Sequence, residues 1–92
     1  MLGSSAHLQI ALMSLELEQA SGEFGTDHPD SDQAVYVLSG RGKALIGERT
    51  LALEPGDLVV IQAGEKHQLI GDAEEPFKAL NIYGPIAYPD EA

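Results

Sequence analysis

The chain has 92 residues, which is enough for one small domain and too few for two. Its 43% hydrophobic and 22% charged residues are ordinary for a folded protein and argue against disorder. The excess of acidic residues gives a net charge of −10, which excludes binding to nucleic acid or anionic membranes. Such a chain would be repelled by both and would displace no counterions from them.

Cysteine is absent from the sequence, which excludes disulfide bonds, thiolate metal sites and a cysteine nucleophile. Any metal must therefore be held by nitrogen and oxygen ligands. The N-terminal residues lack the basic start of a signal peptide, and no apolar run reaches membrane-spanning length. We therefore expect a cytoplasmic protein with a single domain over residues 1–92.

The first predicted element is a long strand in the alternating sequence HLQIALMSLELE, residues 7–18. Leucine and isoleucine occupy the even positions up to Leu12, and the apolar phase shifts to odd positions from Met13 onward. This shift predicts a bulge or bend between the two residues. The spacing of Leu8, Leu12 and Leu15 also fits a helix, but the segments that follow all have strand character.

The rest of the chain alternates short apolar runs with turn signals. A Gly47–Glu48 pair and the sequence Glu54-Pro55-Gly56-Asp57 predict tight turns. The runs expected to form strands are QAVYVLSG, KALIG, RTLAL, LVVIQ, HQLIG and FKALNIYG. About seven or eight strands without a convincing helix or an internal repeat predict an all-β barrel or sandwich.

Polar residues in two separate segments have the side chains of a metal site. Thr26, His28 and Gln33 surround a polar turn, and His67 follows a second turn. A turn resets the alternation of a strand, so His28 and Gln33 can both point inward and meet His67. The alternative is that each histidine lies beside its turn in solvent, which is the commoner situation for a lone histidine.

The spacing of these residues resembles the first motif of the cupin family, which has two histidines separated by one residue, then a glutamate and a glycine. His28 stands at the second histidine, Gln33 at the glutamate and Gly40 at the glycine, while Thr26 replaces the first histidine. The second family motif is similar to residues 56–71. Gly56, Gly64 and His67 match it in register.

The resemblance implies a small cupin-like protein with a double-stranded β-helix, or jelly-roll barrel. It also implies a divalent metal, either Zn²⁺, Mn²⁺ or Fe²⁺, held by His28, Gln33 and His67, with Thr26 lining the site. This chain departs from the family's three histidines and one glutamate, because Gln33 brings no charge and one histidine is missing. One of Asp27, Asp30 and Asp32 is an alternative source of a carboxylate, and a solvated turn is the simpler interpretation of all three.

Gln62 and Asn81 lie on strand phases that can point into the barrel, so we take both as pocket-lining candidates, with a surface position as the alternative. Tyr36, Phe77 and Tyr83 are expected in the core or at an interface, with one of them lining the ligand pocket as the alternative. Exposed edge strands are a liability that a two-fold axis removes, so we expect a homodimer that pairs the strand within residues 7–18.

Two functions remain open from the sequence. One is a metalloenzyme of unknown reaction, in which the metal polarises a substrate oxygen or activates water. The other is a non-catalytic module that binds or senses a small molecule with a degenerate metal site. A regulatory domain of a transcription factor is disfavoured, since no helix-turn-helix pattern is present and the charge opposes DNA.

Overall fold

The computed structural model describes residues 2–5, 7–16, 19–21, 24–25, 30–72 and 74–85. These residues form strands and turns without a helix, so the all-β expectation is confirmed. The strands are β1 (Gly3–Ser4), β2 (Gln9–Leu15), β3 (Asp32–Ser39), β4 (Gly42–Ile46), β5 (Arg49–Leu53), β6 (Leu58–Ile61), β7 (His67–Gly71) and β8 (Phe77–Gly84). Within these described ranges, no helix has the length and apolar character needed to cross a bilayer.

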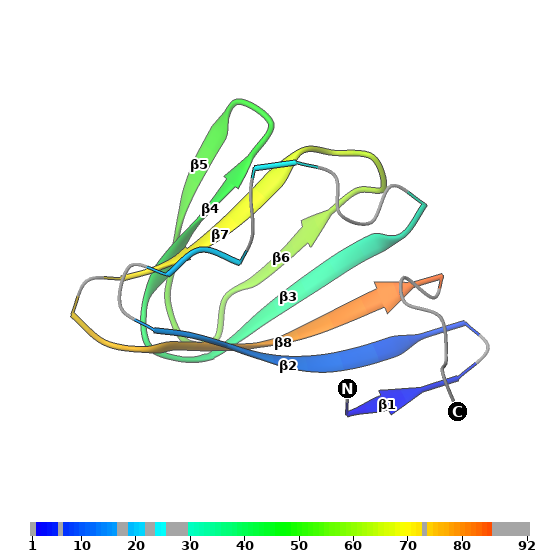
Figure 1. The fold of residues 1–92 in the computed structure, drawn as a ribbon, viewed down its shortest axis with the longest axis horizontal. Coiled ribbons are helices and arrows are strands. Elements are labelled where there is room, and N and C mark those ends of the chain that lie inside the picture. The colour runs from blue at the N-terminus through cyan, green and yellow to red at the C-terminus, as the bar shows by residue number, and fades with distance from the viewer. Residues whose placement is uncertain are drawn as a thin grey trace.

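The strands form two antiparallel sheets that pack face to face (Figure 1). One sheet has the order β1-β2-β8-β3-β6 and the other has the order β5-β4-β7. The chain passes from one sheet to the other after β3, β5, β6 and β7, which interleaves the two layers. This arrangement is the double-stranded β-helix expected from the sequence.

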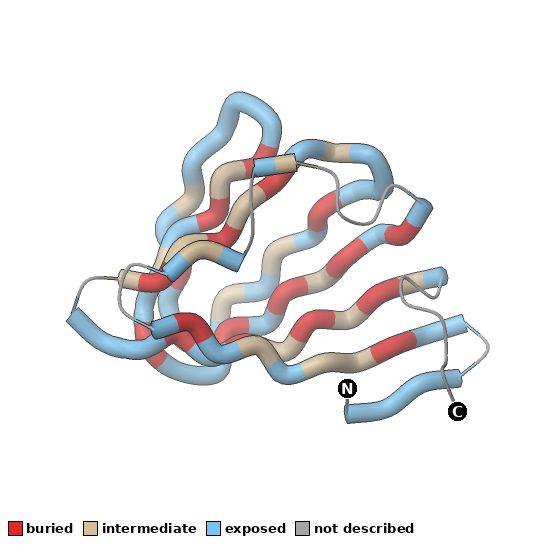
Figure 2. The backbone as a smooth tube through the Cα atoms, in the orientation of Figure 1, coloured by how far each residue is buried: buried red, intermediate tan, exposed pale blue. Residues whose placement is uncertain are grey.

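The core lies between the two sheets because every long strand turns one of its two phases inward. Buried and more exposed residues alternate along β3 and β8, as Figure 2 shows. The apolar residues that fill the interior are Leu15, Val35, Val37, Ala44, Ile46, Leu53, Ile61, Leu69, Phe77 and Ala79. Phe77 is 0% exposed and is the largest of the fully buried side chains.

The strand expected in residues 7–18 is present as β2, but the expected bulge is wrong. β2 pairs with β8 in one continuous register from Gln9 opposite Tyr83 to Leu15 opposite Phe77. The inward phase is odd throughout, and Leu12 lies on the outer face. The sequence suggested a change of phase because apolar residues lie on both faces of β2. A regular strand with two apolar faces gives the same sequence pattern without a bulge. A register shift occurs instead in β3, between Val37 and Ser39.

Gly40 allows the chain to cross from β3 to β4. Its φ is 75°, a backbone conformation that residues with a side chain rarely adopt. A Cβ atom at this position would lie 1.9 Å from the carbonyl oxygen of Pro76. The corner therefore requires glycine for both its backbone angle and the space around it.

Residues 19–21 and 24–25 lie along the edge of β7, where the sequence predicted only a glycine-rich connection. The Ser21 amide donates to the Leu69 carbonyl at 2.7 Å, and the Gly71 amide donates to the Gln19 carbonyl at 2.9 Å. Gly25 and His67 exchange two backbone hydrogen bonds, of 3.2 and 3.0 Å. The residue just before Thr26 is thereby fixed beside His67.

Candidate functional site

The interior of the barrel changes from apolar to polar along its length. The described polar residues that are buried are Gln9, Ser31, Gln33, His67 and Asn81. Gln9 begins β2, Gln33 lies near the start of β3, and Asn81 lies near the end of β8. Because these neighbouring strands are antiparallel, the three positions fall at the same end of the sheet.

Gln33 lies at the centre of this polar end. On one side it is opposite Tyr83, which in turn is opposite Gln9, and on the other side it is opposite Ile61. Its Nε2 donates a hydrogen bond of 3.2 Å to Oδ1 of Asn81, the diagonal neighbour of Gln33 on β8. The Nε2 group of the Gln33 side-chain amide is therefore held in place by Asn81 on the neighbouring strand.

The other end of the same amide has no hydrogen-bond partner. Gln33 is 4% exposed, and its Oε1 is buried without a donor within reach. Leaving a buried acceptor unsatisfied costs about 1–3 kcal/mol, which is why such atoms are rare in folded proteins. A cation or a ligand donor at Oε1 would remove this cost, so the oxygen fits a binding role.

His67 approaches this end of the barrel from the opposite sheet. It begins β7, is 8% exposed, and lies between Ile46 of β4 and Gly25. Its Nδ1 is 3.0 Å from the carbonyl oxygen of Glu65. A carbonyl only accepts hydrogen bonds, so Nδ1 is the donor in this contact, and in the neutral imidazole the lone pair would then be on Nε2. Metal-binding histidines are commonly held in one tautomer by this type of contact.

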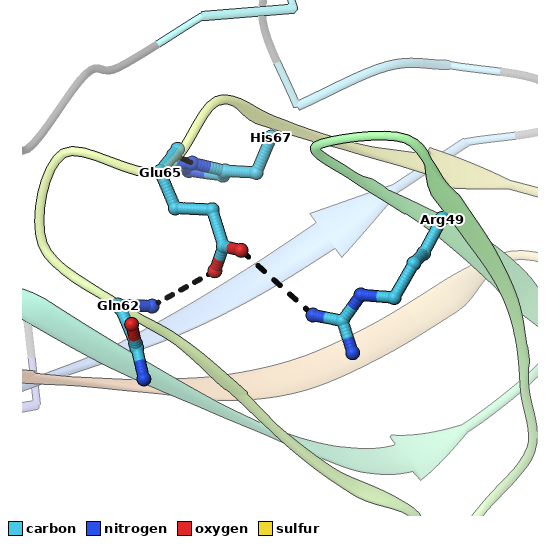
Figure 3. A network of polar contacts seen from close by, with 4 residues as sticks. All are labelled: Arg49, Gln62, Glu65 and His67. Atoms are coloured by element: carbon cyan, nitrogen blue, oxygen red, sulfur yellow. Dashed lines mark hydrogen bonds and ion pairs between the residues drawn. The ribbon is translucent and has the colours of Figure 1, made fainter.

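The turn before His67 holds that carbonyl in position (Figure 3). The backbone amide of Gln62 donates to Oε1 of Glu65 at 3.2 Å, and the backbone amide of Glu65 donates to the backbone carbonyl of Gln62 at 3.0 Å. Nη2 of Arg49 on β5 lies 3.8 Å from Oε2 of Glu65 in a partly exposed ion pair, which adds little stability. The hydrogen bonds of the turn therefore hold the Glu65 carbonyl that contacts the His67 ring.

Asp32 joins the two halves of the candidate site. Its Oδ1 accepts a hydrogen bond of 2.8 Å from the amide of Ala63, in the turn between β6 and β7. This bond ties the start of β3, one residue before Gln33, to the turn that leads into His67. Gln33 and His67 are consequently at the same end of the barrel, on opposite sheets.

The structure places the residues predicted from the sequence as follows. Gln33, His67 and Asn81 are buried at the polar end of the barrel. Gln62 is exposed on the turn, so it does not share the interior position of Asn81. Thr26 and His28 lie outside the described residues. The carboxylate of Asp32 holds a backbone amide, and Asp30 is exposed.

Gln9, Ser31 and Tyr83 also belong to the polar end; of these, only Tyr83 was a pocket-lining alternative from the sequence. Ser31 donates a hydrogen bond of 2.7 Å to the Pro85 carbonyl, which holds the segment before β3 against the end of β8. Gln9 shares the inward phase of β2 with Met13 and Leu15. A polar residue on the same phase as Met13 and Leu15 is the signal that could have identified Gln9.

The described residues supply only part of a metal-binding set. No group of three or more histidine, aspartate or glutamate side chains is positioned to hold a metal in this part of the chain. The donors present are the imidazole of His67 and the unsatisfied amide oxygen of Gln33. Both are suitable ligands for a borderline divalent ion, and a third ligand would have to come from elsewhere.

Residues 11–83 match a protein-family model described as "Cupin domain". The uncharacterized protein YrkC of Bacillus subtilis (strain 168) is 30% identical over 95 residues, a match that covers 96% of this chain and 50% of that protein. The chain therefore spans about half the length of this curated relative.

Two solved structures illustrate the similarity in fold. A protein from Bacillus halodurans is 29% identical with a TM-score of 0.83, covering 95% of this chain and 69% of that one. A proposed sugar phosphate isomerase from Acidithiobacillus ferrooxidans is 30% identical with a TM-score of 0.76, covering 87% of this chain and 51% of that one.

Proposed function

The chain belongs to the cupin domain family, and we propose that this member binds a divalent cation at the polar end of its barrel, through His67, Gln33 and His28. The observation that carries the proposal is the buried Oε1 of Gln33, which has no hydrogen-bond partner. A metal ion at this oxygen would satisfy it, and a neutral His67 that donates from Nδ1 would offer Nε2 as a second ligand.

Chain connectivity supports His28 as the third ligand. Gly25, three residues before it, is hydrogen-bonded to His67 on both sides of the peptide. Ser31 lies three residues after His28 and two residues before Gln33. Its hydroxyl donates a hydrogen bond to the Pro85 carbonyl. Both ends of the short segment that contains Thr26 and His28 are thus anchored at the polar end, and we propose that Thr26 lines the site or holds a water ligand.

The chemistry of such a site follows from its neutral ligands. Two imidazoles and an amide bring no negative charge, so the ion would keep nearly its full charge of +2. When bound, it would supply a Lewis acid able to polarise a substrate oxygen or lower the pKa of bound water. The absence of a carboxylate ligand also weakens binding, so we expect lower affinity than a site with three histidines and a glutamate would have.

A second candidate is metal-free binding of a small polar molecule. It is favoured by the chemistry of the described buried polar residues, among which there is no aspartate, glutamate, lysine or arginine. Neutral amides and hydroxyls suit a ligand rich in hydroxyl groups, such as a sugar. The similarity to a proposed sugar phosphate isomerase over 87% of this chain is consistent with that class.

Metal analysis of protein purified without chelators tests the first function. We expect near-stoichiometric Zn²⁺, Mn²⁺ or Fe²⁺, and its loss in the His67→Ala variant. The His7→Ala variant is the matched control, because His7 is exposed and lies before β2. Metal at substoichiometric levels that His67→Ala does not change would refute the proposal.

Thermal melts separate the two candidates. A bound ion stabilises the folded state by about 2.7 kcal/mol at a free concentration one hundred times its Kd. Under the metal proposal, EDTA lowers the Tm of the wild-type protein and of His7→Ala, but leaves His67→Ala unchanged. A Tm that ignores EDTA and rises with a sugar or polyol favours the metal-free function instead.

A further inference from the structure

Arg49 carries a positive charge on the inner face of the smaller sheet. Residues two apart on a strand share a face, so β5 turns Arg49, Leu51 and Leu53 to the same side. Leu53 is 2% exposed and belongs to the core, and Leu51 packs against that core. Arg49 therefore begins the phase of β5 that faces the interior, while its long side chain remains 61% exposed at the rim.

Strand pairing places this charge at the polar end of the barrel. Ile46 of β4 is opposite Arg49 on one side and opposite His67 on the other. Residues that lie directly opposite share a face of the sheet, so the three form one row across β5, β4 and β7. With strands about 4.8 Å apart, the backbones of Arg49 and His67 are separated by roughly 10 Å. A small molecule between the two side chains can therefore contact both.

The inward phases of the strands are otherwise without formal charge. In the described residues of β2 to β8, Arg49 is the one lysine, arginine, aspartate or glutamate at an inward position. The other polar residues at inward positions are Gln9, Gln33, His67, Asn81 and Tyr83. The chain has only five basic residues, and one of them stands at the rim of the candidate site.

The present partner of Arg49 is easy to displace. Nη2 of Arg49 is 3.8 Å from Oε2 of Glu65, which is longer than a hydrogen bond, and such a pair adds little stability. Figure 3 shows the two side chains reaching toward one another beside His67. The other carboxylate oxygen of Glu65 accepts the backbone amide of Gln62, so Glu65 keeps a partner when Arg49 turns away.

We propose that the ligand of the polar end carries an oxyanion, a carboxylate or a phosphate group, which Arg49 binds in place of the Glu65 carboxylate. A guanidinium presents its N–H donors in a planar fork that matches either group. The inference rests on the proposed function, because the rest of the ligand occupies the site formed by Gln33 and His67. It adds the chemical class of that ligand.

The division of the site into two parts fits such a ligand. The buried amides are neutral and suit hydroxyl or carbonyl groups, whereas a charge buried among them would lose its hydration. At the rim an oxyanion keeps part of its hydration and meets a cation. The net charge of −10 repels anions at long range, so a direct contact with a local cation is required to hold one here.

NMR titration of the arginine side chains tests the inference. The probes are inorganic phosphate and acetate, added at constant ionic strength to isotope-labelled protein, both as purified and after its metal has been removed by dialysis. We expect the Nε–Hε signal of Arg49 to shift and saturate with a Kd on the order of millimolar, because one exposed guanidinium supplies only a weak contact. The probe with the lower Kd identifies the anionic group.

Arg41 provides the matched control. It forms an ion pair with Glu54 at 3.9 Å and is 64% exposed, so it resembles Arg49 in both respects. It precedes Gly42, which is opposite Leu53, and therefore lies at the other end of the hairpin formed by β4 and β5. Its signal should not saturate with either probe.

Four variants measure the contribution of each group to phosphate affinity. Arg49→Ala should weaken binding by about tenfold, and Arg41→Ala by less than about twofold. Arg49→Lys should give an intermediate loss, since lysine keeps the charge without the fork. Glu65→Gln removes the competing charge and keeps an acceptor for the Gln62 amide, so it should tighten binding by about threefold.

The results separate this inference from the proposed function. Equal responses of Arg41 and Arg49, or an unchanged phosphate affinity in Arg49→Ala, would overturn the ligand class even if a metal binds as proposed. Phosphate bound through Arg49 in protein that holds no divalent ion would support the ligand class and refute the metal proposal.

Discussion

The Gln33→Glu substitution tests the candidate site most directly, because it changes charge with little change in shape. The side chain is 4% exposed, so a carboxylate there loses its hydration. The variant also replaces the donor to Asn81, now at 3.2 Å, with an oxygen that repels Oδ1. Both effects disfavour the charged form in the folded protein.

The magnitude follows from the pKa of the new carboxyl. An ordinary glutamate titrates near 4.3, and burial raises the pKa in the folded state by several units. At 1.36 kcal/mol per unit, the loss of stability at pH 7 is at most about 3–4 kcal/mol. The loss disappears below about pH 4, where the carboxyl is protonated in both states, and grows as the pH rises toward the folded-state pKa.

A bound cation should offset the loss of stability in the Gln33→Glu variant. A divalent ion at position 33 neutralises the carboxylate, so saturating Zn²⁺ or Mn²⁺ should stabilise the variant more than the wild type. The assay is urea unfolding at pH 5 and pH 7, with EDTA and with each metal. Gln62→Glu is the control, because Gln62 is exposed and its substitution should change stability by less than about 0.5 kcal/mol. Equal stability of Gln33→Glu and wild type in EDTA at pH 7, or equal gains from metal, would refute the reasoning.

Four further substitutions test the fold and the turn before His67, each by urea unfolding. Gly40→Ala should cost about 3–5 kcal/mol, because its Cβ would lie 1.9 Å from the Pro76 carbonyl oxygen. Gly47→Ala has open space and a φ of 57°, so it should cost only about 1–2 kcal/mol, and a similar loss for both would contradict the steric argument. Phe77→Ala empties a fully buried position and should cost about 3–5 kcal/mol, and a loss under 1 kcal/mol would contradict the assigned core. Arg49→Ala removes an exposed ion pair and should change stability by less than about 0.5 kcal/mol, whereas a larger loss would show that the pair holds the turn before His67.

The sequence alone predicted the strands well because their signal is local. Period-two alternation and turn residues such as Gly47 are properties of a few neighbouring positions, and they indicated an all-β chain before any packing was known. The resemblance of residues 26–71 to the cupin motifs was confirmed by the family match over residues 11–83. The strand in residues 7–18 was correct in type, and its predicted change of phase after Leu12 was wrong because both of its faces are apolar.

The candidate site could be predicted only in part, because its residues come from strands far apart in the chain. Sequence spacing named Gln33, His67 and Asn81, and the structure buries all three at one end of the barrel. Sequence spacing could not show that Gln62 differs from these buried residues. Gln62 is one residue past the buried Ile61 and lies on an exposed turn. His28 remains a prediction, since it lies outside the described residues.

By itself, then, the sequence determined the period of each strand, the positions of the turns and the types of ligand available. The tertiary structure decided which phase faces inward, that residues 19–21 and Gly25 pair with β7, and that one amide oxygen of Gln33 is left buried without a partner. The reason is that alternation is a property of consecutive residues. Burial and hydrogen-bond satisfaction depend on the neighbouring strand and the opposite sheet, and local patterns carry little information about either.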